Sequence, residues 1–428
     1  MKNPLNDWQQ IPFQEFAAFN PRESLQKGQV AKHVGMENIQ PFTRKVPVYS
    51  EKAFGGGSKF VNGDTLLARI TPCLENGKTA QVDFLMSGEV GFGSTEFIVI
   101  REKQNLSDNN FLFYFSISPR FRSEAIKSMS GTSGRQRVQT DSIAKTEFAF
   151  PALKEQKAIA AVLTSLDDKI ELLREQNKTL AAIAQALFKH WFVDFEFPNE
   201  KGKPYKSSDG KMANSEFGQI PNGWKIGELQ DLVENTIDNR GKTPLTSNTP
   251  TNYPLIEGQN ITSDNPFPVL VEFPKQKFVE ESIYLNWFRG GHPRAYDILC
   301  ATVGTLPKWC FAGERNLCIA QNIIAIRAKR EIASPFFLKT LLNSPRFISD
   351  FNGRLITAVQ PSIKVGHMMT IPIVIPEKKA IEKFDIVSHS FAKKISNNFN
   401  QVQILFSLRN FLLPKLMKGE IRIEHNEV

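Results

Sequence analysis

The sequence predicts an α+β protein in which two mixed α/β domains are joined by two long antiparallel α-helices, with an internal duplication and pseudo-two-fold symmetry. Three observations predict this fold class. The chain has 428 residues, which is more than one ordinary core accommodates. Two stretches follow the alternating four-three spacing of a coiled-coil seam. Several short motifs occur twice in the same order, which indicates a duplicated unit.

The first domain spans residues 1–150, where short apolar runs such as GDTLLARI and TEFIVIR alternate with Gly and Pro. This pattern is typical of strands and turns in a mixed α/β domain. The segment 151–198 then predicts a long helix from about Glu155 to about His190. Its predicted seam residues are Ile159, Leu163, Leu166, Ile170, Leu173, Asn177, Leu180, Ala184, Leu187 and Trp191.

Within that seam we interpret Asn177 as a buried amide, which fixes the register of paired helices at some cost in stability. The outer face of the helix, including Asp167, Asp168 and Trp191, is then the part that could contact a partner protein.

The second half repeats this order after a polar stretch at 199–223, which we interpret as a linker or loop. A second mixed domain fills 224–375, and helical spacing returns in 376–428. Polar residues at three seam positions predict that this second helix packs less tightly than the first. The second seam consists of Phe384, Ser388, Phe391, Ile395, Asn398, Val402, Leu405, Arg409, Leu412 and Leu416.

Local sequence matches support the duplication, because coincidence would supply one such pair but not several in the same order. The matching pairs are Trp8 with Trp224, ENI at 37–39 with QNI at 259–261, GDTLLARI at 63–70 with YDILCATV at 296–303, and SPRF at 118–121 with SPRF at 344–347.

Charge follows the same division of the chain. The two mixed segments, 1–150 and 201–375, carry net charges of +3 and +5 of the total of +9. A polyanion is therefore a reasonable partner for the mixed domains.

The N-terminal residues lack the apolar core of a signal peptide, so we expect a cytoplasmic protein without a membrane span. The four cysteines include no CxxC pair, and the six histidines form no ligand motif, so no metal site is expected.

Two motifs resemble nucleotide-binding or methyltransferase motifs, but a loop or a turn explains each of them better. GKT occurs at 77–79 and 241–243, but a nucleotide-binding loop needs a Gly five residues before the GK pair, where Pro72 and Thr236 stand. Each GKT is either a phosphate-contacting loop or an ordinary turn, and the turn is favoured at Gly77. NPF at 265–267 lacks the second proline of the motif by which amino-methyltransferases hold an extruded base, which favours a surface turn.

Three stretches carry a resemblance to a known family: FPALKEQKAIAAVLTSLDDKI with ALFKHWFVDFEFP, then RGKTP with YPLIEGQNI, and finally LRNFLLPKLMKGEIRI. Together they resemble the conserved and target recognition regions of type I restriction-modification system specificity (S) subunits, over essentially the whole chain. The sequence departs from the family where EQKAI becomes EKKAI at Glu377 and where the first domain lacks RGKTP.

The resemblance implies target recognition domains at 1–150 and 224–375, and conserved spacer helices in 151–198 and 376–428. Such a subunit recognises a bipartite, asymmetric site in double-stranded DNA. It directs two methyltransferase (M) subunits, which modify adenine N6, and restriction/motor (R) subunits to that site. This chain would then carry no catalytic site and no cofactor, because S-adenosylmethionine, ATP and Mg²⁺ belong to the partner subunits.

Two other functions remain possible on the residues alone. One is a fused modification enzyme, against which the missing cofactor and catalytic motifs argue. The other is a coiled-coil adaptor whose basic domains bind proteins, which periodicity does not exclude.

The predicted DNA contacts are basic or polar residues of loops, among which GTSGRQRV at 131–138 offers two glycines for close backbone approach and two arginines. Each has the alternative interpretation of a solvated basic turn. The predicted DNA-binding residues are Arg44, Lys45, Lys59, Arg69, Lys78, Arg135, Arg137, Arg240, Lys242, Thr243, Arg289, Arg294, Lys308, Arg315, Arg354 and Lys364.

Overall fold

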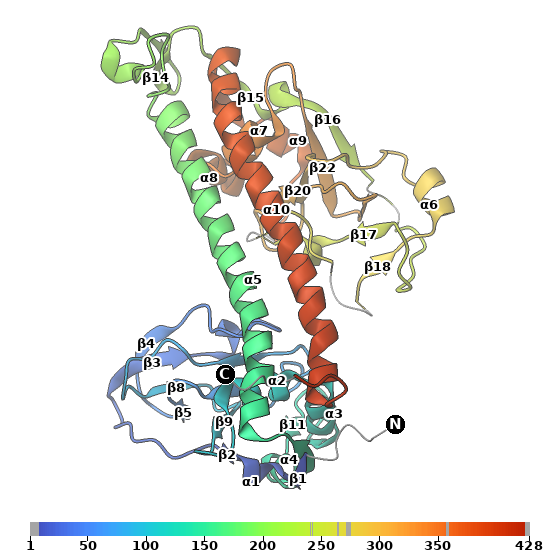
Figure 1. Cartoon of the computed structure of the whole chain (residues 1–428). Helices are drawn as coiled ribbons and strands as arrows, with labels where there is room; N and C mark the ends of the chain where they lie inside the picture. The colour runs from blue at the N-terminus through green and yellow to red at the C-terminus, as the bar shows by residue number, and fades with distance from the viewer. Residues whose placement is uncertain are drawn as a thin grey trace. The chain divides into compact units, whose positions relative to one another are not determined.

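The computed structural model describes residues 8–239, 241, 243–262, 265–270, 275–356 and 359–423. Its chain forms two compact units (Figure 1). Unit 1 comprises Met1–Glu171 together with Gln403–Val428, and unit 2 comprises Leu172–Val402. Each unit therefore contains part of both long helices.

Unit 1 contains two four-stranded sheets, ordered β2-β9-β6-β7 and β4-β3-β8-β5, and the small pairs β1-β12 and β10-β11. Their strands are β1 (Gln9–Pro12), β2 (Ala17–Phe19), β3 (Val30–Val34), β4 (Ser50–Ala53), β5 (Ser58–Phe60), β6 (Thr65–Ala68), β7 (Thr79–Gln81), β8 (Gly91–Gly93), β9 (Phe97–Glu102), β10 (Met129–Ser130), β11 (Arg137–Val138) and β12 (Glu147–Phe150). The short helices are α1 (Phe13–Phe16), η1 (Met36–Asn38), α2 (Asn109–Ile117), α3 (Pro119–Lys127) and α4 (Thr140–Lys145).

Unit 2 contains sheets ordered β16-β22-β19-β20 and β18-β17-β21, and the pairs β15-β23 and β13-β14. Their strands are β13 (Met212–Ser215), β14 (Gly218–Pro221), β15 (Lys225–Glu228), β16 (Val233–Asp238), β17 (Pro254–Ile256), β18 (Lys277–Phe278), β19 (Ile298–Ala301), β20 (Trp309–Phe311), β21 (Cys318–Ile319), β22 (Ile323–Ala328) and β23 (Pro372–Ile375). The short helices are η2 (Lys189–Val193), η3 (Lys206–Ser208), η4 (Leu229–Leu232), η5 (Gly258–Asn260), α6 (Glu281–Asn286), α7 (Pro335–Leu342), α8 (Pro345–Gly353) and α9 (Val365–Met369).

The predicted duplication is confirmed by one sheet of each unit. The order β2-β9-β6-β7 corresponds to β16-β22-β19-β20, and both sheets are antiparallel throughout. Asp64, at the start of GDTLLARI, forms an ion pair of 2.6 Å with Arg101, and Asp297 forms one of 2.7 Å with Arg327. The repeated motif thus places the same buried ion pair at the same position of both sheets.

The repeated SPRF motif begins a helix in each unit. The hydroxyl oxygens of Ser118 and Ser344 accept hydrogen bonds from the backbone amides of Phe121 and Phe347. Proline follows each serine at the first helical position, where its missing N–H costs no intrahelical bond. The motif is therefore a helix start and needs no functional explanation.

The two long helices are α5 (Leu153–Phe188) and α10 (Lys378–Met417). The predicted first helix thus begins and ends two residues earlier than expected. In unit 2, Asn177 lies opposite Ile395 and Asn398, and in unit 1 Asp167 lies opposite Arg409. Because residue numbers rise along one helix as they fall along the other, α5 and α10 run antiparallel. The predicted fold class of mixed domains with two long helices is confirmed.

Polar residues in the seam are paired across the two helices. Asn398 is fully buried and donates a hydrogen bond of 3.0 Å to the side-chain oxygen of Asn177. The guanidinium of Arg409 lies 2.8 Å from Asp167, and the Tyr114 hydroxyl donates a 2.8 Å hydrogen bond to the same carboxylate. The placement of Asp167 on an outer face was wrong, because Asp167 is buried and serves as the partner of Arg409.

The segment predicted to be a linker forms the hairpin β13-β14 in its second half, where Ser215 is paired with Gly218. The Ser215 hydroxyl closes the turn by donating to the Gly218 carbonyl. The guanidinium of Arg346 lies 3.5 Å from the centre of the Phe217 ring, which holds the hairpin tip against α8. The sequence offered no strand signal here, because the strands have no apolar alternation.

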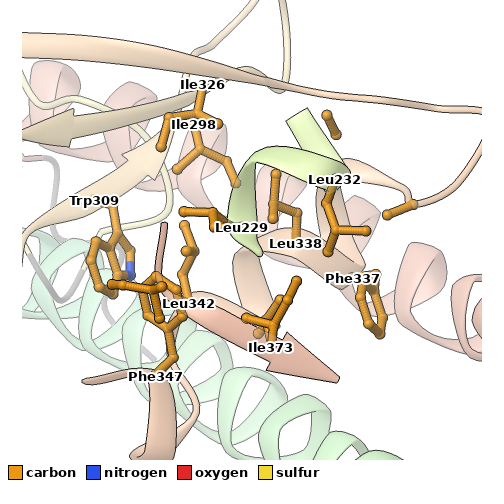
Figure 2. Packing of buried hydrophobic residues seen from close by; sticks show 14 of the residues in the cluster. Leu229, Leu232, Ile298, Trp309, Ile326, Phe337, Leu338, Leu342, Phe347 and Ile373 are labelled. Carbon is orange, nitrogen blue, oxygen red and sulfur yellow. The ribbon is translucent and has the colours of Figure 1, made fainter. Parts of the chain in front are cut away.

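The largest core cluster of unit 2 packs β19, β20 and β22 against α7 and α8 (Figure 2). Phe337 and Leu338 of α7 and Phe347 of α8 are almost completely buried there. Phe267, from the NPF motif, also belongs to this cluster and lies 5.4 Å, between ring centres, from Phe399 of α10. NPF is therefore a bend whose aromatic ring is buried, rather than the surface turn that we predicted.

Among the described residues, the helices are too short or too polar to span a membrane.

We expect Arg409→Met to destabilise unit 1 strongly, because it leaves the buried Asp167 carboxylate without its cation. Breaking a buried pair on one side costs about 3–5 kcal/mol. Thermal unfolding followed by circular dichroism measures this loss.

The double variant Arg409→Met/Asp167→Asn should recover part of the stability, since it removes both charges while an amide oxygen can still accept from the Tyr114 hydroxyl. Lys418→Met is the matched control, because Lys418 is exposed and its ion pair with Glu420 contributes little. Equal unfolding temperatures for Arg409→Met and Lys418→Met would contradict a structural role of the buried pair.

Candidate nucleic-acid interface

The predicted loop 131–138 is anchored beside the end of β6. Its ends pair as β10 and β11, and the amide of Val138 donates a 2.8 Å hydrogen bond to the carbonyl of Arg69. Gly131 and Gly134 have φ angles of +126° and +77°, which side-chain-bearing residues rarely adopt. The two glycines are thus required by the turn itself, which projects Arg135 between its two anchored ends.

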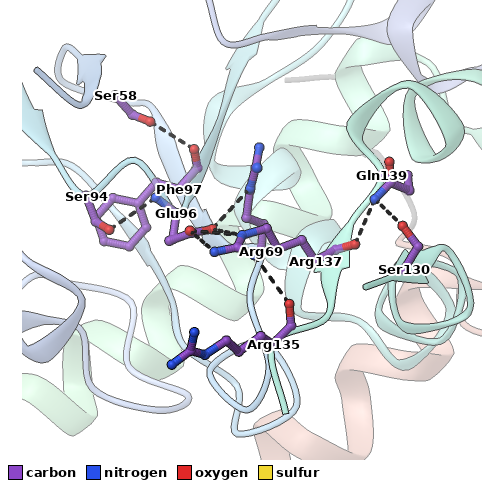
Figure 3. A network of polar contacts seen from close by, with 9 residues as sticks. All are labelled: Ser58, Arg69, Ser94, Glu96, Phe97, Ser130, Arg135, Arg137 and Gln139. Carbon is purple, nitrogen blue, oxygen red and sulfur yellow. Dashed lines mark hydrogen bonds and ion pairs between the residues drawn. The ribbon is translucent and has the colours of Figure 1, made fainter. Parts of the chain in front are cut away.

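Glu96, just before β9, joins two of the predicted DNA-binding arginines (Figure 3). One of its oxygens lies 2.7 Å from an Arg137 guanidinium nitrogen, and the other lies 3.3 Å from Nε of Arg69. The hydrogen bond from Arg137 lowers the pKa of the Glu96 carboxyl below its usual value, and Arg69 adds to this effect. The carboxylate is therefore ionised at neutral pH. We call Arg69, Glu96 and Arg137 the charged triad.

Arg135 completes this surface (Figure 3). Its side chain is exposed and forms no ion pair with any residue in the described part of the chain, while its carbonyl accepts a hydrogen bond from Arg137. Arg69 and Arg137 are one-third and two-fifths exposed, at 33% and 39%. The site thus presents three guanidinium groups to solvent, with one carboxylate holding two of them in place.

Unit 2 repeats the backbone of this site with different side chains. The amide of Ile363 donates to the Thr302 carbonyl at 2.9 Å, as Val138 does to Arg69 in unit 1. The amide of Thr302 donates to the Asn322 carbonyl at 2.9 Å, and that of Arg69 donates to the Glu96 carbonyl at 3.0 Å. With Ser362 beside Ile363, the charged triad corresponds to Thr302, Asn322 and Ser362. We call these three residues the neutral triad.

The remaining predicted residues of unit 1 are engaged within the protein. Arg44 forms an ion pair with Asp168 of α5, and Lys45 lies 3.4 Å from Asp83. The ammonium groups of Lys59 and Lys78 donate to the backbone carbonyls of Glu23 and Met36, at 2.8 and 2.7 Å. Gly77 of the first GKT has a φ of +80°, which fits the turn that we favoured.

In unit 2, most of the predicted residues are exposed, and Arg354 is an exception because its guanidinium donates to the His367 carbonyl and to Thr370. Lys308 is partly buried beside Trp309. The exposed residues are Thr243, Arg289, Arg294, Arg315 and Lys364. Arg240 and Lys242 lie outside the described residues.

Glu96 was absent from our predicted site because acidic residues were not considered for a DNA-binding surface. Its position was available in the sequence, since TEFIVIR at 95–101 matches QNIIAIR at 321–327 and places Glu96 opposite Asn322.

Within the described part of the chain, no three His, Cys, Asp or Glu residues are arranged to hold a metal ion. Burial raises the pKa of the Cys300, Cys310 and Cys318 thiols to about 12.

Comparison with known proteins gives consistent matches. The family model described as "Type I restriction modification DNA specificity domain" matches residues 18–182. The MjaIX type I restriction enzyme specificity subunit of Methanocaldococcus jannaschii is 27% identical, over 73% of this chain and 69% of that protein. The HindI specificity subunit of Haemophilus influenzae is 26% identical, over 84% and 86%. The S subunit structure from M. genitalium is 15% identical, with a TM-score of 0.47 over 96% of each chain.

We expect Glu96→Gln to loosen the loop 131–138, because the neutral amide no longer binds two guanidinium groups through charge-assisted hydrogen bonds. Hydrogen–deuterium exchange at neutral pH should be faster in this loop and unchanged in β6. Glu89→Gln, which disrupts the ion pair with Lys32, is the control and should leave the loop unaffected. Identical exchange in the wild type and Glu96→Gln would show that the backbone hydrogen bonds alone hold the loop.

Proposed function

The chain belongs to the family of type I restriction-modification specificity subunits, and from this premise we propose that it reads a bipartite, asymmetric DNA target. Each unit reads one half of the target through its own loops. Positive charge on both mixed segments supports this proposal, because contacts to phosphate supply much of the affinity of DNA-binding proteins. Arginine forks beside such contacts can read guanine in the major groove.

The observation that carries the proposal is the contrast between the charged and neutral triads. Both triads occupy one backbone framework, which is held by matching hydrogen bonds. In unit 1 the framework presents Arg69 and Arg137, whereas unit 2 presents Thr302 and Ser362 at the corresponding positions. Two readers with the same scaffold and different side chains are what an asymmetric two-part target requires.

We further propose that the chain is not itself catalytic. It would direct methyltransferase subunits, which use S-adenosylmethionine to modify adenine, and restriction subunits to the target. The exposed residues of α5 and α10 are available as a docking surface for the methyltransferase subunits, whereas Asp167 and Arg409 are committed to each other. Cofactor binding would then belong to the partner subunits.

Exchanging residues 1–150 for the corresponding segment of another specificity subunit should change one half of the recognised sequence and leave the other half unchanged. Each unit has its own core clusters, so a change in unit 1 does not reach the loops of unit 2. Mapping methylated adenines after reconstitution with methyltransferase subunits measures both halves.

The controls are the chimera alone and the wild-type chain alone, each without methyltransferase subunits. Neither control should methylate DNA. Methylation by the wild-type chain alone would identify a fused modification enzyme. A simultaneous change of both half-sites would contradict independent reading by the two units.

We expect Glu96→Gln to raise the affinity of the reconstituted complex for non-target DNA and to steepen its salt dependence by up to about one unit of the log–log slope. The substitution removes a negative charge that would face phosphate and releases Arg69 and Arg137 for additional contacts. Fluorescence anisotropy at several salt concentrations measures this effect.

Asn322→Asp provides the reverse test, because it introduces a negative charge at the corresponding place in unit 2 and should weaken binding. If neither variant changes DNA affinity or its salt dependence, the two triads lie outside the DNA interface.

A further inference from the structure

Unit 2 contains a cavity of about 480 Å³ between its part of the helix pair and its recognition fold. Six aromatic rings line it, from Phe267, Tyr296, Trp309, Phe311, Phe336 and Phe391. Its size falls in the range of pockets that enclose small organic molecules. These rings, together with alanine, proline and isoleucine side chains, make most of the cavity wall apolar.

Three lysines line this space, Lys178, Lys308 and Lys339, and of these Lys178 is paired with Glu175 at 2.7 Å. Lys339 of α7 lines the cavity, with its ammonium 5.6 Å from the centre of the Phe311 ring. No carboxylate in the described part of the chain pairs with it. Burial lowers the pKa of the Lys339 ammonium below its usual value. Lys339 is partly buried, and a partly desolvated charge without a counter-ion would be stabilised by an anion in the cavity.

A second polar group in the cavity wall also lacks a partner. The side-chain nitrogen of Gln185, on α5, is buried and has no hydrogen-bond partner among the described residues. By contrast, the indole N–H of Trp309 donates to Asn343 at 2.7 Å, so this polar group of the wall is satisfied. Lys339 and Gln185 thus supply two donors without acceptors.

Comparison with unit 1 shows how the cavity arises. Asp108 and Ser334 cap α2 and α7 in the same way, by accepting from the amide three residues later. Counting from these caps, Lys339 and Thr340 occupy the places of Phe113 and Tyr114. Both residues are almost completely buried in unit 1, and the Tyr114 hydroxyl is bound to Asp167. Unit 2 has therefore exchanged two large rings for a cation and a small residue.

The backbone beside the cavity is strained at one residue. Tyr296 has a φ of +69°, a region that bulky residues rarely adopt. Its counterpart in the repeated motif of unit 1 is Gly63, which adopts a φ of +91° with little strain. Unit 2 thus carries a tyrosine ring in the cavity wall at a conformational cost that a glycine would avoid.

We propose that this cavity binds a small amphipathic organic anion, whose apolar ring system lies among the aromatic side chains and whose single carboxylate or sulfonate group pairs with Lys339 and Gln185. The bound anion contacts α5, α7 and α10 together, and so stabilises the packing of the helix pair against the recognition fold of unit 2. This site is separate from the triads.

Two fluorescent probes test the proposal on the full chain. The anionic probe is anilinonaphthalene sulfonate, and N-phenylnaphthylamine is nearly the same ring system without the charge. We expect both to bind. Lys339→Met should weaken binding of the anionic probe about tenfold, because it removes a charge-assisted contact, and should leave binding of the neutral probe within about twofold. Lys329→Met, an exposed lysine outside the cavity, should change neither affinity.

Thr340→Tyr locates the probes, because it restores the ring that unit 1 carries and fills the cavity. We expect it to abolish binding of both probes, with the circular dichroism spectrum and unfolding temperature showing that the variant is folded. If the Lys339→Met variant binds the anionic probe as tightly as the wild type does, or if the folded Thr340→Tyr variant binds both probes, the proposed site is wrong.

Discussion

Both units depend on the register of α5 relative to α10, and polar side chains set that register at apolar seam positions. In unit 1 the determinant is the buried pair of Asp167 and Arg409, and in unit 2 it is the amide pair of Asn177 and Asn398. An apolar seam tolerates a slip of one helical turn, whereas a slip here would leave charges and amides buried without partners. These polar residues reduce the apolar packing between α5 and α10, and they make one register of the two helices specific.

With that register fixed, both units present the same backbone framework around their triads. The side chains at the triad positions differ between the two units. The repeated Asp–Arg ion pairs and the hydrogen bonds to the carbonyls of Arg69 and Thr302 hold the sheet and the loop in both units. These contacts involve main-chain atoms or residues at the ends of the two central strands of each sheet. Side chains at the triad positions are consequently free to differ without loss of the fold.

The fold was predictable because it rests on repeated and periodic patterns. GDTLLARI and YDILCATV mark equivalent strands, and the apolar spacing of α5 marks its length to within two residues at each end. The pairing of Asp167 with Arg409 was not predictable, because a charged residue next to a seam is indistinguishable by spacing from one on the outer face. Glu96 was missed although its match with Asn322 was visible in the sequence, because a search for basic DNA contacts gives no reason to select an acidic residue.

The basic residues chosen from the sequence illustrate the same limit. Lys59 and Lys78 have the composition of DNA contacts, yet their ammonium groups bind backbone carbonyls of unit 1. Arg135 has the same sequence character and extends into solvent. Charge and loop propensity identify a basic surface, but only the three-dimensional arrangement distinguishes an internal ion from an external one.

The division of unit 1 along the chain bears on how the protein folds during synthesis. Leu413, Leu416 and Met417 belong to the core of unit 1, and Arg422 pairs with Glu155, which Trp8 also contacts. Unit 2 is continuous in sequence from Leu172 to Val402, so a ribosome delivers all of it before residues 403–428. The unit translated first is thus the last to be completed, which reverses the usual order of N-terminal domains folding first. Until then, the nascent first unit exposes the apolar surface that the last turns of α10 will cover.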